Sequence, residues 1–163
     1  MRVTSCAVPS GGVLSPYAAQ DATYTDCFEA RLTAQVSLAR FLGAFYTTGL
    51  FRLERLALTL PLRRWIGDGE LYDMAAGRSD EFAIWTVEAR DSRQILLRER
   101  SGRTRSYLAV EAMDAGVTRL LFGSAVVPGH GQTLPGAVRF MGPLHRAYSR
   151  ALLGLAARSL RRS

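Results

Sequence analysis

The polar side chains best suited to act on a small molecule gather near one end of a predicted sheet. They comprise one carboxylate and three hydroxyls, followed by a histidine in the next loop: Glu99, Thr104, Ser106, Ser124 and His130. Hydroxyl groups can orient a ligand by hydrogen bonds, and a carboxylate near an imidazole can move protons. Glu99 and His130 are therefore the candidate catalytic residues, and the hydroxyls are candidate ligand contacts.

Two interpretations of Glu99 stay open. A carboxylate that faces an apolar cavity is costly to keep charged unless it is paired, and His130 and Arg139 are then its candidate partners. Glu99 also lies next to a predicted turn, so its side chain could instead pass the edge of the sheet into water. His145 is interpreted as a histidine at the edge of the core, and Tyr148 as a core residue whose hydroxyl could meet a ligand.

The element that must position these residues is an antiparallel meander between residues 82 and 127. Four apolar, β-branched runs are separated by turn residues at 91–93, 101–102 and 114–116. The turns fix which residues lie opposite each other. The predicted pairs are Trp85 with Glu99, Val87 with Leu97, Ala89 with Ile95, Leu97 with Ser106, Arg98 with Arg105, Ile95 with Leu108, Leu108 with Phe122, Val110 with Leu120 and Glu111 with Arg119.

This register gives the sheet an apolar face and a charged face. The apolar face holds Trp85, Val87, Ala89, Ile95, Leu97, Leu108, Val110, Leu120, Phe122 and Val126. The other face holds Glu88, Arg98, Arg100, Arg103, Arg105, Glu111 and Arg119. We therefore expect a sheet that is buried on its inner face and wet on its outer face.

A C-terminal helix over 143–161 is expected to cover the inner face. Leu144, Tyr148, Leu152 and Leu155 recur at helical spacing, with arginines on the opposite side. Pro143 suits the first helical turn. Residues 138–141 would then form either an earlier, kinked turn or the approach to the helix.

The remaining elements precede the meander. We expect an extended or poorly ordered leader over 1–23, a half-buried strand over 24–32, and two short helices over 35–46 and 50–60. A turn at 67–69, a short strand over 70–75 and, after the meander, a loop at 128–133 complete the chain. A single domain over 24–163 follows.

Composition favours one globular domain, and since no cofactor-binding motif is found we expect no bound cofactor. The chain has 163 residues, of which 48% are hydrophobic and 21% charged, which is enough for one well-packed core. No apolar run is long enough to predict a transmembrane segment or a secretory signal, so we expect a cytoplasmic protein. The two cysteines are too few for a disulfide framework and match no metal-ligand spacing.

The formal charge of +7 is weak evidence for nucleic-acid binding. All basic residues are arginine, which is typical of a GC-rich coding bias, and no nucleic-acid-binding motif is present. We therefore expect no nucleic-acid partner. The cluster Arg98, Arg100, Arg103 and Arg105 is expected to be solvated, or else to meet anionic lipid headgroups or an acidic protein surface.

The order of elements resembles the helix-grip fold (α+β) of the START-like and polyketide-cyclase-like superfamily. The residues that carry the resemblance are 24–29 (YTDCFE) and 143–146 (PLHR), and the chain is most similar to bacterial domains of unknown function. The resemblance implies a curved antiparallel sheet around the last helix, with an apolar ligand between them. It supplies no catalytic signature.

Three functions follow as hypotheses. The first is a small-molecule-binding protein whose apolar ligand contacts Trp85, Val87, Leu97, Glu99, Thr104, Ser106, Leu108, Phe122, Ser124, Met141, Tyr148 and Leu152. The second is a cyclase-like or dehydratase-like enzyme in which Glu99 and His130 move protons. The third is an interaction module that binds another chain, or pairs as a homodimer, through an outer face with Phe82, Ile84, Leu96, Tyr107, Leu121 and the arginines.

Overall fold

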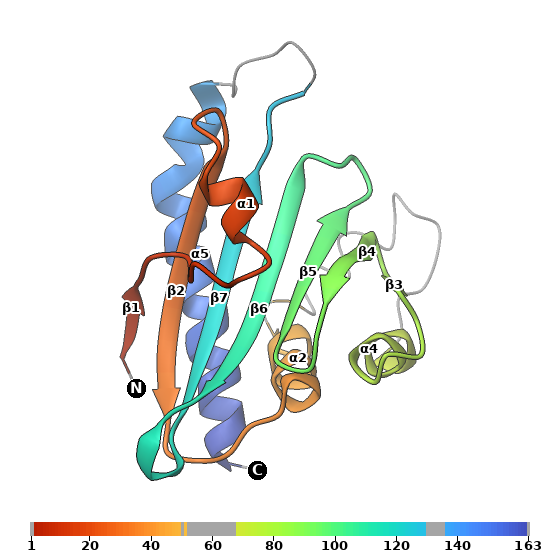
Figure 1. Ribbon diagram of the computed structural model, residues 1–163, viewed down its shortest axis with the longest axis vertical. Helices are drawn as coiled ribbons and strands as arrows, with labels where there is room; N and C mark the ends of the chain where they lie inside the picture. Colours follow the sequence, from red (N-terminus) through yellow and green to blue (C-terminus); the bar gives the residue numbers. More distant parts are fainter. Residues whose placement is uncertain (1, 50, 52–67, 130–135, 163) are drawn as a thin grey trace.

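The protein is an α+β domain built on one antiparallel sheet (Figure 1). The computed structural model describes residues 2–49, 51, 68–129 and 136–162, and only the backbone over 136–141. The seven strands are ordered β1-β2-β7-β6-β5-β4-β3. Their bounds are β1 Val3–Ser5, β2 Tyr24–Leu32, β3 Glu81–Phe82, β4 Trp85–Arg90, β5 Gln94–Glu99, β6 Thr104–Ala112 and β7 Thr118–Val126. The helices are α1 Ser15–Ala18, α2 Leu38–Tyr46, α4 Asp68–Ala75 and α5 Gly136–Arg162, with a 3-10 turn at Asp114–Gly116.

The predicted register is confirmed across the meander except at one bulge. Leu97 lies opposite Ser106, and Leu108 lies opposite both Ile95 and Phe122. Between Val87 and Ala89 the register shifts, so that Ala89 pairs with Leu96 and not with Ile95. A bulge inserts an extra residue and turns the following side chain to the other face. Ala89 accordingly packs against apolar residues of the outer face, a cluster that includes Leu96 and Tyr107.

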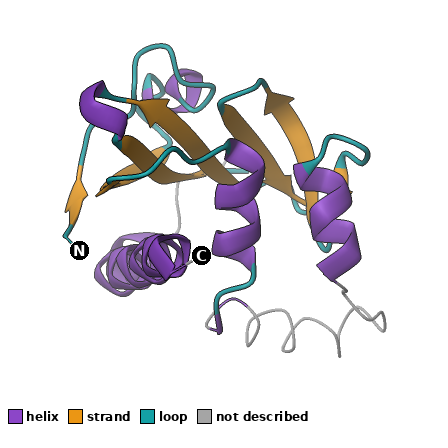
Figure 2. Cartoon of the chain, turned by 90° about the horizontal axis from the view of Figure 1, so that it is seen from below, coloured by secondary structure: helices purple, strands orange, loops and turns teal. Residues whose placement is uncertain are grey.

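Three helices share the inner face of the sheet (Figure 2). Helix α5 packs along β1, β2 and β7, α2 packs on β6 and α5, and α4 packs on α2 and β3. The predicted C-terminal cover is therefore present, but α2 and α4 cover the part of the sheet that α5 does not contact. A curved antiparallel sheet with a long C-terminal helix against its inner face is the helix-grip arrangement, as expected.

Helix α5 differs from its prediction in where it begins and in which side is buried. It begins at Gly136, so Pro143 lies inside it and residues 138–141 form an earlier helical turn. Leu144 and Leu155 are 67% and 38% exposed, whereas Leu152 is buried. The buried stripe is Ser149, Leu152, Leu153, Ala156, Ala157 and Leu160. Both series follow the helical period, but the buried stripe lies on a different side of the helix from Leu144 and Leu155.

Residues 2–23 differ most from the prediction, because they form the edge strand β1 and then cover part of the outer face of the sheet. Leu14 is fully buried in a second apolar cluster, the outer cluster, together with Cys27, Leu96, Tyr107, Ala109, Leu121 and Ala125. A Cβ atom on Gly123 would lie 2.8 Å from Leu14 Cδ2, so only glycine allows this close approach. The N-terminal segment thus buries the middle of the outer face, which was predicted to be wet. Of the charged residues predicted on that face, Glu88, Arg98, Arg100 and Arg103 are exposed as expected.

This covering changes the environment of one predicted surface arginine. Arg105 is only 8% exposed and pairs with Glu88, with 2.9 Å between Arg105 Nε and Glu88 Oε2. Its Nε also donates to the hydroxyl of Tyr17, which lies in α1 and donates to Glu88 in turn. Arg98, Arg100 and Arg103 are exposed, so the four-arginine cluster is reduced to three on the surface.

Two further expectations concern the segment between α2 and the meander. The short strand predicted over 70–75 is wrong: these residues belong to α4, which buries Leu71 and Met74. The Asp68 and Glu70 carboxylates in its first turn favour a helix there. The helix predicted over 50–60 lies almost wholly outside the described residues.

If the leader is part of the folded domain, Leu14→Ala should be strongly destabilising. Removing a fully buried leucine costs about 2–4 kcal/mol of the free energy of unfolding, because contacts are lost and a cavity remains. Leu144→Ala, at a position 67% exposed, is the matched control and should change it by about 0.5 kcal/mol or less. Equal effects in urea unfolding would contradict the docking of this segment.

Candidate functional site

Four polar side chains meet on the inner face, between β2, β7 and α5. Asp26 accepts hydrogen bonds from both neighbouring hydroxyls: Ser124 Oγ lies 2.6 Å from Asp26 Oδ1, and the Tyr24 hydroxyl lies 3.1 Å from Asp26 Oδ2. His145 Nε2 lies 2.9 Å from Ser124 Oγ and 3.7 Å from Asp26 Oδ2. We call Tyr24, Asp26, Ser124 and His145 the inner polar cluster.

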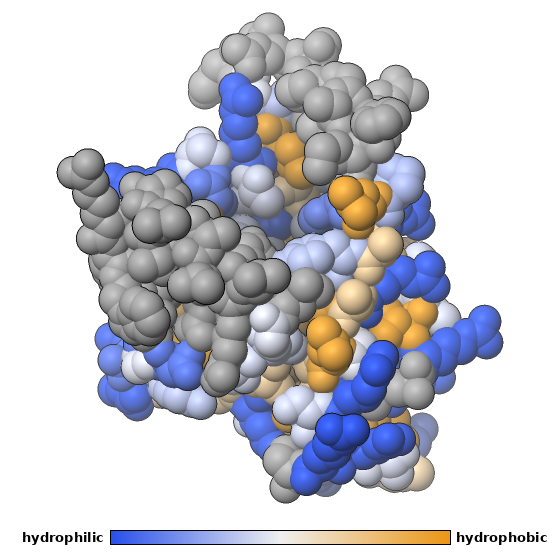
Figure 3. Space-filling model, turned by 180° about the vertical axis from the view of Figure 1, so that it is seen from behind, coloured by the Kyte–Doolittle hydropathy of each residue, from blue (hydrophilic) through white to orange (hydrophobic). Residues whose placement is uncertain are grey.

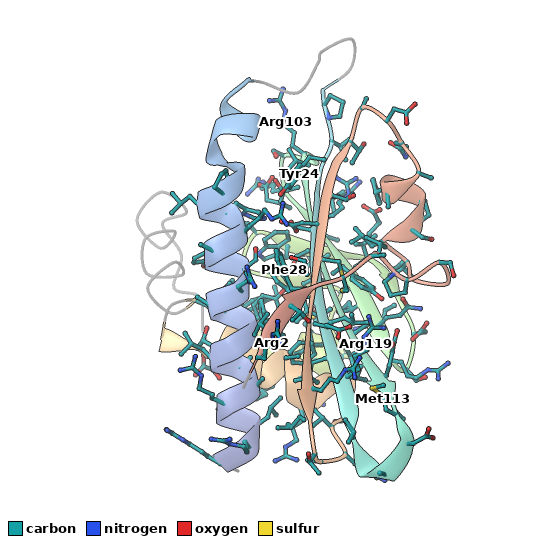
Figure 4. The ribbon with its side chains drawn as sticks, turned by 90° about the vertical axis from the view of Figure 1, so that its left-hand side faces the viewer. Arg2, Tyr24, Phe28, Arg103, Met113 and Arg119 are labelled. Carbon is teal, nitrogen blue, oxygen red and sulfur yellow. The ribbon has the colours of Figure 1, made fainter. Side chains whose placement is uncertain are left out.

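The strand pairing places this cluster. Asp26 lies directly opposite Ser124, and Tyr24 lies opposite Val126, so both β2 residues share the inner face with Phe28. Alternation along a strand makes this inevitable, since Tyr24, Asp26 and Phe28 are two residues apart. Figure 4 shows Tyr24 and Phe28 at successive levels of β2 beside α5. The helix then brings His145 to the same level as Asp26.

Asp26 is the buried carboxylate at the centre of the cluster. The Asp26 side chain is only 6% exposed, and a buried carboxylate is tolerable when donors surround it. Its bond with Ser124 has the short length typical of a hydroxyl that donates to a carboxylate. Burial, helped by the charge of Asp26 and the hydrogen bond to it, raises the pKa of Tyr24 to about 12.

The geometry excludes the relay of a Ser-His-Asp triad. In a triad the imidazole contacts serine through one ring nitrogen and aspartate through the other. Here Ser124 and Asp26 both lie on the Nε2 side of His145. Because the single hydroxyl proton of Ser124 goes to Asp26, His145 Nε2 must donate to Ser124. The imidazole therefore cannot take a proton from Ser124 in this arrangement, and the cluster is built to hold and orient polar groups.

Inner-face residues form rows that run across the strands of the sheet, and the inner polar cluster lies at the β2 end of two such rows. The end row contains Trp85, Glu99, Thr104, Val126 and Tyr24, and the second row contains Val87, Leu97, Ser106, Ser124 and Asp26. In the second row, the Ser106 hydroxyl lies 3.3 Å from the hydroxyl of Tyr46, the last residue of α2. The expectation that polar groups gather at one end of the inner face is thus confirmed for Thr104, Ser106 and Ser124.

Several predicted ligand contacts lie instead inside a packed core. Leu97, Leu108, Phe122 and Leu152 are at most 6% exposed. Aromatic side chains of α2 occupy the inner face at this level, with the Phe45 and Phe122 ring centroids 4.6 Å apart. Trp85, Val87 and Tyr148 are half-buried and pack at the margin of this core. Of the predicted ligand contacts, Leu97, Leu108, Phe122 and Leu152 are therefore core residues, whereas Trp85, Val87 and Tyr148 keep some exposed surface.

The described hydrogen bonds of Glu99 go to the turn beside it. They support the second interpretation, in which its side chain lies at the edge of the sheet and not in a cavity. Its carboxylate accepts from the backbone nitrogen of Ser101 at 3.0 Å and from the Ser101 hydroxyl, which stabilises the β5–β6 turn. His130 lies outside the described residues, as do the side chains of Arg139 and Met141. The predicted pairing of Glu99 with His130 stays a prediction.

Sequence reasoning missed Asp26 and Tyr24 and gave His145 a structural role. Alternation along 24–32 was the signal that could have found the first two, because it places them on the face of Phe28. Nothing in the sequence indicated that α5 would set His145 against Asp26. Within the described parts of the chain, no three or more His, Cys, Asp or Glu side chains are grouped to hold a metal ion.

No protein-family model matches the chain, and no curated protein matches it. Among solved structures, a conserved protein of unknown function, EF2215 from Enterococcus faecalis, is similar over 86% of this chain and 73% of its own, with 11% identity and a TM-score of 0.44. The crystal structure of Ara h 8.0201 is similar over 82% of this chain and 97% of its own, with 12% identity and a TM-score of 0.38. The helix-grip assignment rests on the strand order and on α5, and these likenesses add no functional information.

The inner polar cluster predicts a pH dependence of stability at high pH. The pKa of Tyr24 is raised from 10 to about 12 by folding, so its contribution is complete below pH 10 and is lost as the pH rises toward about 12. The unfolding free energy of the wild type should therefore fall more steeply across this window than that of Tyr24→Phe. Tyr72→Phe, at an exposed tyrosine, is the control. Parallel wild-type and Tyr24→Phe curves would show that Tyr24 is not held as the neutral phenol.

Proposed function

We propose that the protein binds a small, largely apolar molecule that carries one hydrogen-bonding group. The observation that carries this proposal is the buried Asp26 carboxylate, which Tyr24, Ser124 and His145 surround at one end of a largely apolar inner face. A few convergent polar groups beside apolar residues are the usual design of a ligand site. The bound molecule would lie against the two end rows and not along the whole length of α5.

Burial along the inner face supports this location. In the end row, Trp85, Thr104 and Val126 are half-buried, whereas Ile95 and Leu108, one row beyond Leu97, are fully buried. Apolar side chains that stay half-exposed beside a packed core offer surface to an apolar ligand. Figure 3 shows the helix side of the molecule, where hydrophobic residues lie beside hydrophilic ones.

The chemistry of Asp26 supports a donor group on the ligand. An ionised carboxylate can accept about four hydrogen bonds. Tyr24 and Ser124 supply two, one to each oxygen, and His145 stands 3.7 Å away. A hydroxyl or N–H group of a ligand could therefore be accepted by the remaining lone pairs.

A buried hydroxyl one helical turn from His145 supports the same region. Ser149 is fully buried, and its Oγ has no hydrogen-bond partner among the described residues. An unsatisfied buried hydroxyl costs about 1–3 kcal/mol, so a partner there would stabilise the protein. A polar atom of a bound molecule is one such partner.

Filling the end row should block binding. Thr104→Trp places a large side chain on the inner face and should weaken the affinity for 2-naphthol, an aromatic probe with one hydroxyl, by about tenfold or more, which is about 1.4 kcal/mol. Thr86→Trp makes the same change at a half-buried position of the outer face and should leave binding intact. The measurement is a fluorescence titration, with circular dichroism to verify folding. Equal affinities for both variants would exclude this location.

The polar cluster should also create a preference for a hydroxyl. The wild type should bind 2-naphthol more tightly than naphthalene by about tenfold, because a hydrogen bond to a charged group contributes about 1.5–3 kcal/mol. Asp26→Asn should reduce this preference by weakening the acceptor, while Asp21→Asn, at an exposed carboxylate, should not. A preference that survives Asp26→Asn would separate Asp26 from ligand recognition.

A second candidate function is proton transfer on the bound molecule, as in a cyclase or dehydratase. The observation that favours it is the approach of the His145 imidazole to the Asp26 carboxylate within 3.7 Å. In this version the pair His145 and Asp26 takes the role first assigned to His130 and Glu99, because Glu99 is engaged by the turn at Ser101.

A further inference from the structure

The only two cysteines of the chain lie opposite each other, with Cys27 on β2 and Cys6 directly after the end of β1. Cys6 and Cys27 are far apart in sequence, yet Cys6 N donates to Cys27 O at 3.0 Å. Ser5 pairs with Phe28, so continuing the antiparallel register by one residue sets Cys6 against Cys27. Residues directly opposite each other in such a pair have their side chains on the same face. Both cysteines accordingly pack in the outer cluster.

This backbone arrangement suits a disulfide. The Cα atoms of opposed residues in an antiparallel pair lie about 4.5–5.5 Å apart, depending on their hydrogen bonding. Disulfides usually join residues whose Cα atoms are about 4.4–6.8 Å apart. A bond between the two sulfur atoms would therefore need a change of side-chain rotamer and little movement of the backbone.

The two thiols differ in the way that thiol–disulfide exchange requires. Cys6 is half-buried, and its pKa is lowered chiefly by a hydrogen bond with the Cys27 thiol, with a further contribution from the charge of Arg119. Cys27 is buried, and the same hydrogen bond together with burial raises its pKa. A more acidic, more accessible thiol attacks an external disulfide, and a protected neighbour then resolves the mixed disulfide.

We propose that Cys6 and Cys27 form a reversible disulfide that ties the N-terminal segment to β2. The Cys6 thiolate attacks one sulfur of a low-molecular-weight disulfide of the glutathione class and displaces one thiolate. Cys27, once deprotonated, attacks the Cys6 sulfur of this mixed disulfide and displaces the second thiolate. The protein loses two electrons and two protons, and the small disulfide is reduced to two thiols.

The position of the bond gives it a structural consequence. Cys6 begins the segment that carries Leu14 and Tyr17 across the outer face, and this segment closes over Gly123. Gly123 is opposite Cys27 and adjacent to Ser124 of the inner polar cluster. A disulfide would thus fix the N-terminal segment on the outer face of β2 and β7. The inner face of the same two strands holds the proposed ligand site.

The test uses the full chain in a glutathione buffer with the oxidised form in excess, followed by intact-mass measurement under denaturing conditions. The wild type should become a monomer that is lighter by two hydrogen atoms and has no free thiol. Cys27→Ser should instead retain one glutathione on Cys6, whereas Cys6→Ser should react little because Cys27 is buried. Two free thiols in the wild type, a retained glutathione or a disulfide-linked dimer would each overturn the proposal.

Thermal unfolding provides the second readout. The oxidised wild type should melt about 5–10 °C above the reduced wild type, since the cross-link restricts the unfolded chain. Cys6→Ser, which cannot form the bond, should melt at the same temperature before and after the same oxidation when no reductant is present. A disulfide that forms without raising the melting temperature would show that it does not fix the N-terminal segment.

Discussion

The structure depends on a sheet that carries an apolar cluster on each face, and the register of β2 decides which residues join which cluster. Alternation along this strand sends Asp26 and Phe28 to the helices and Cys27 to the N-terminal segment. A shift of one residue would exchange the two sets, leaving the carboxylate in the outer cluster and the thiol beside His145. The register of β2 against β7 therefore fixes the core, the inner polar cluster and the cysteine pair together.

One part of the inner face is filled by core side chains, and another part keeps half-buried residues beside polar groups. Aromatic residues of α2 fill it at the level of Phe122, so the sheet and α5 do not enclose an open space along their whole length. Near the other end, half-buried residues of β4, β6 and β7 lie in the same cross-sheet rows as the inner polar cluster. The proposed ligand site thus occupies the region where the chain supplies polar groups and leaves apolar surface exposed.

Local patterns predicted the strands well because turn residues determine antiparallel pairing. The strand bounds of β2 and the pairing of β5 with β6 and of β6 with β7 follow directly from the sequence. The bulge at Ala89, the docking of Leu14 and the contact between His145 and Ser124 depend on distant packing, which single-sequence patterns do not contain. The alternation of residues along β2 could have placed Asp26 on the inner face. Its approach to His145 could not be predicted, because it depends on how α5 packs on the sheet.

The most direct test of the central claim is to locate a bound probe by amide chemical shifts. Titration of isotope-labelled protein with 2-naphthol should perturb the amides of Tyr24, Thr104, Ser106 and Ser124, which surround the proposed site. The amides of Leu96 and Ala109, in the outer cluster, should stay unchanged. Perturbations confined to the outer cluster, or none at saturating probe, would contradict a ligand site at the inner polar cluster.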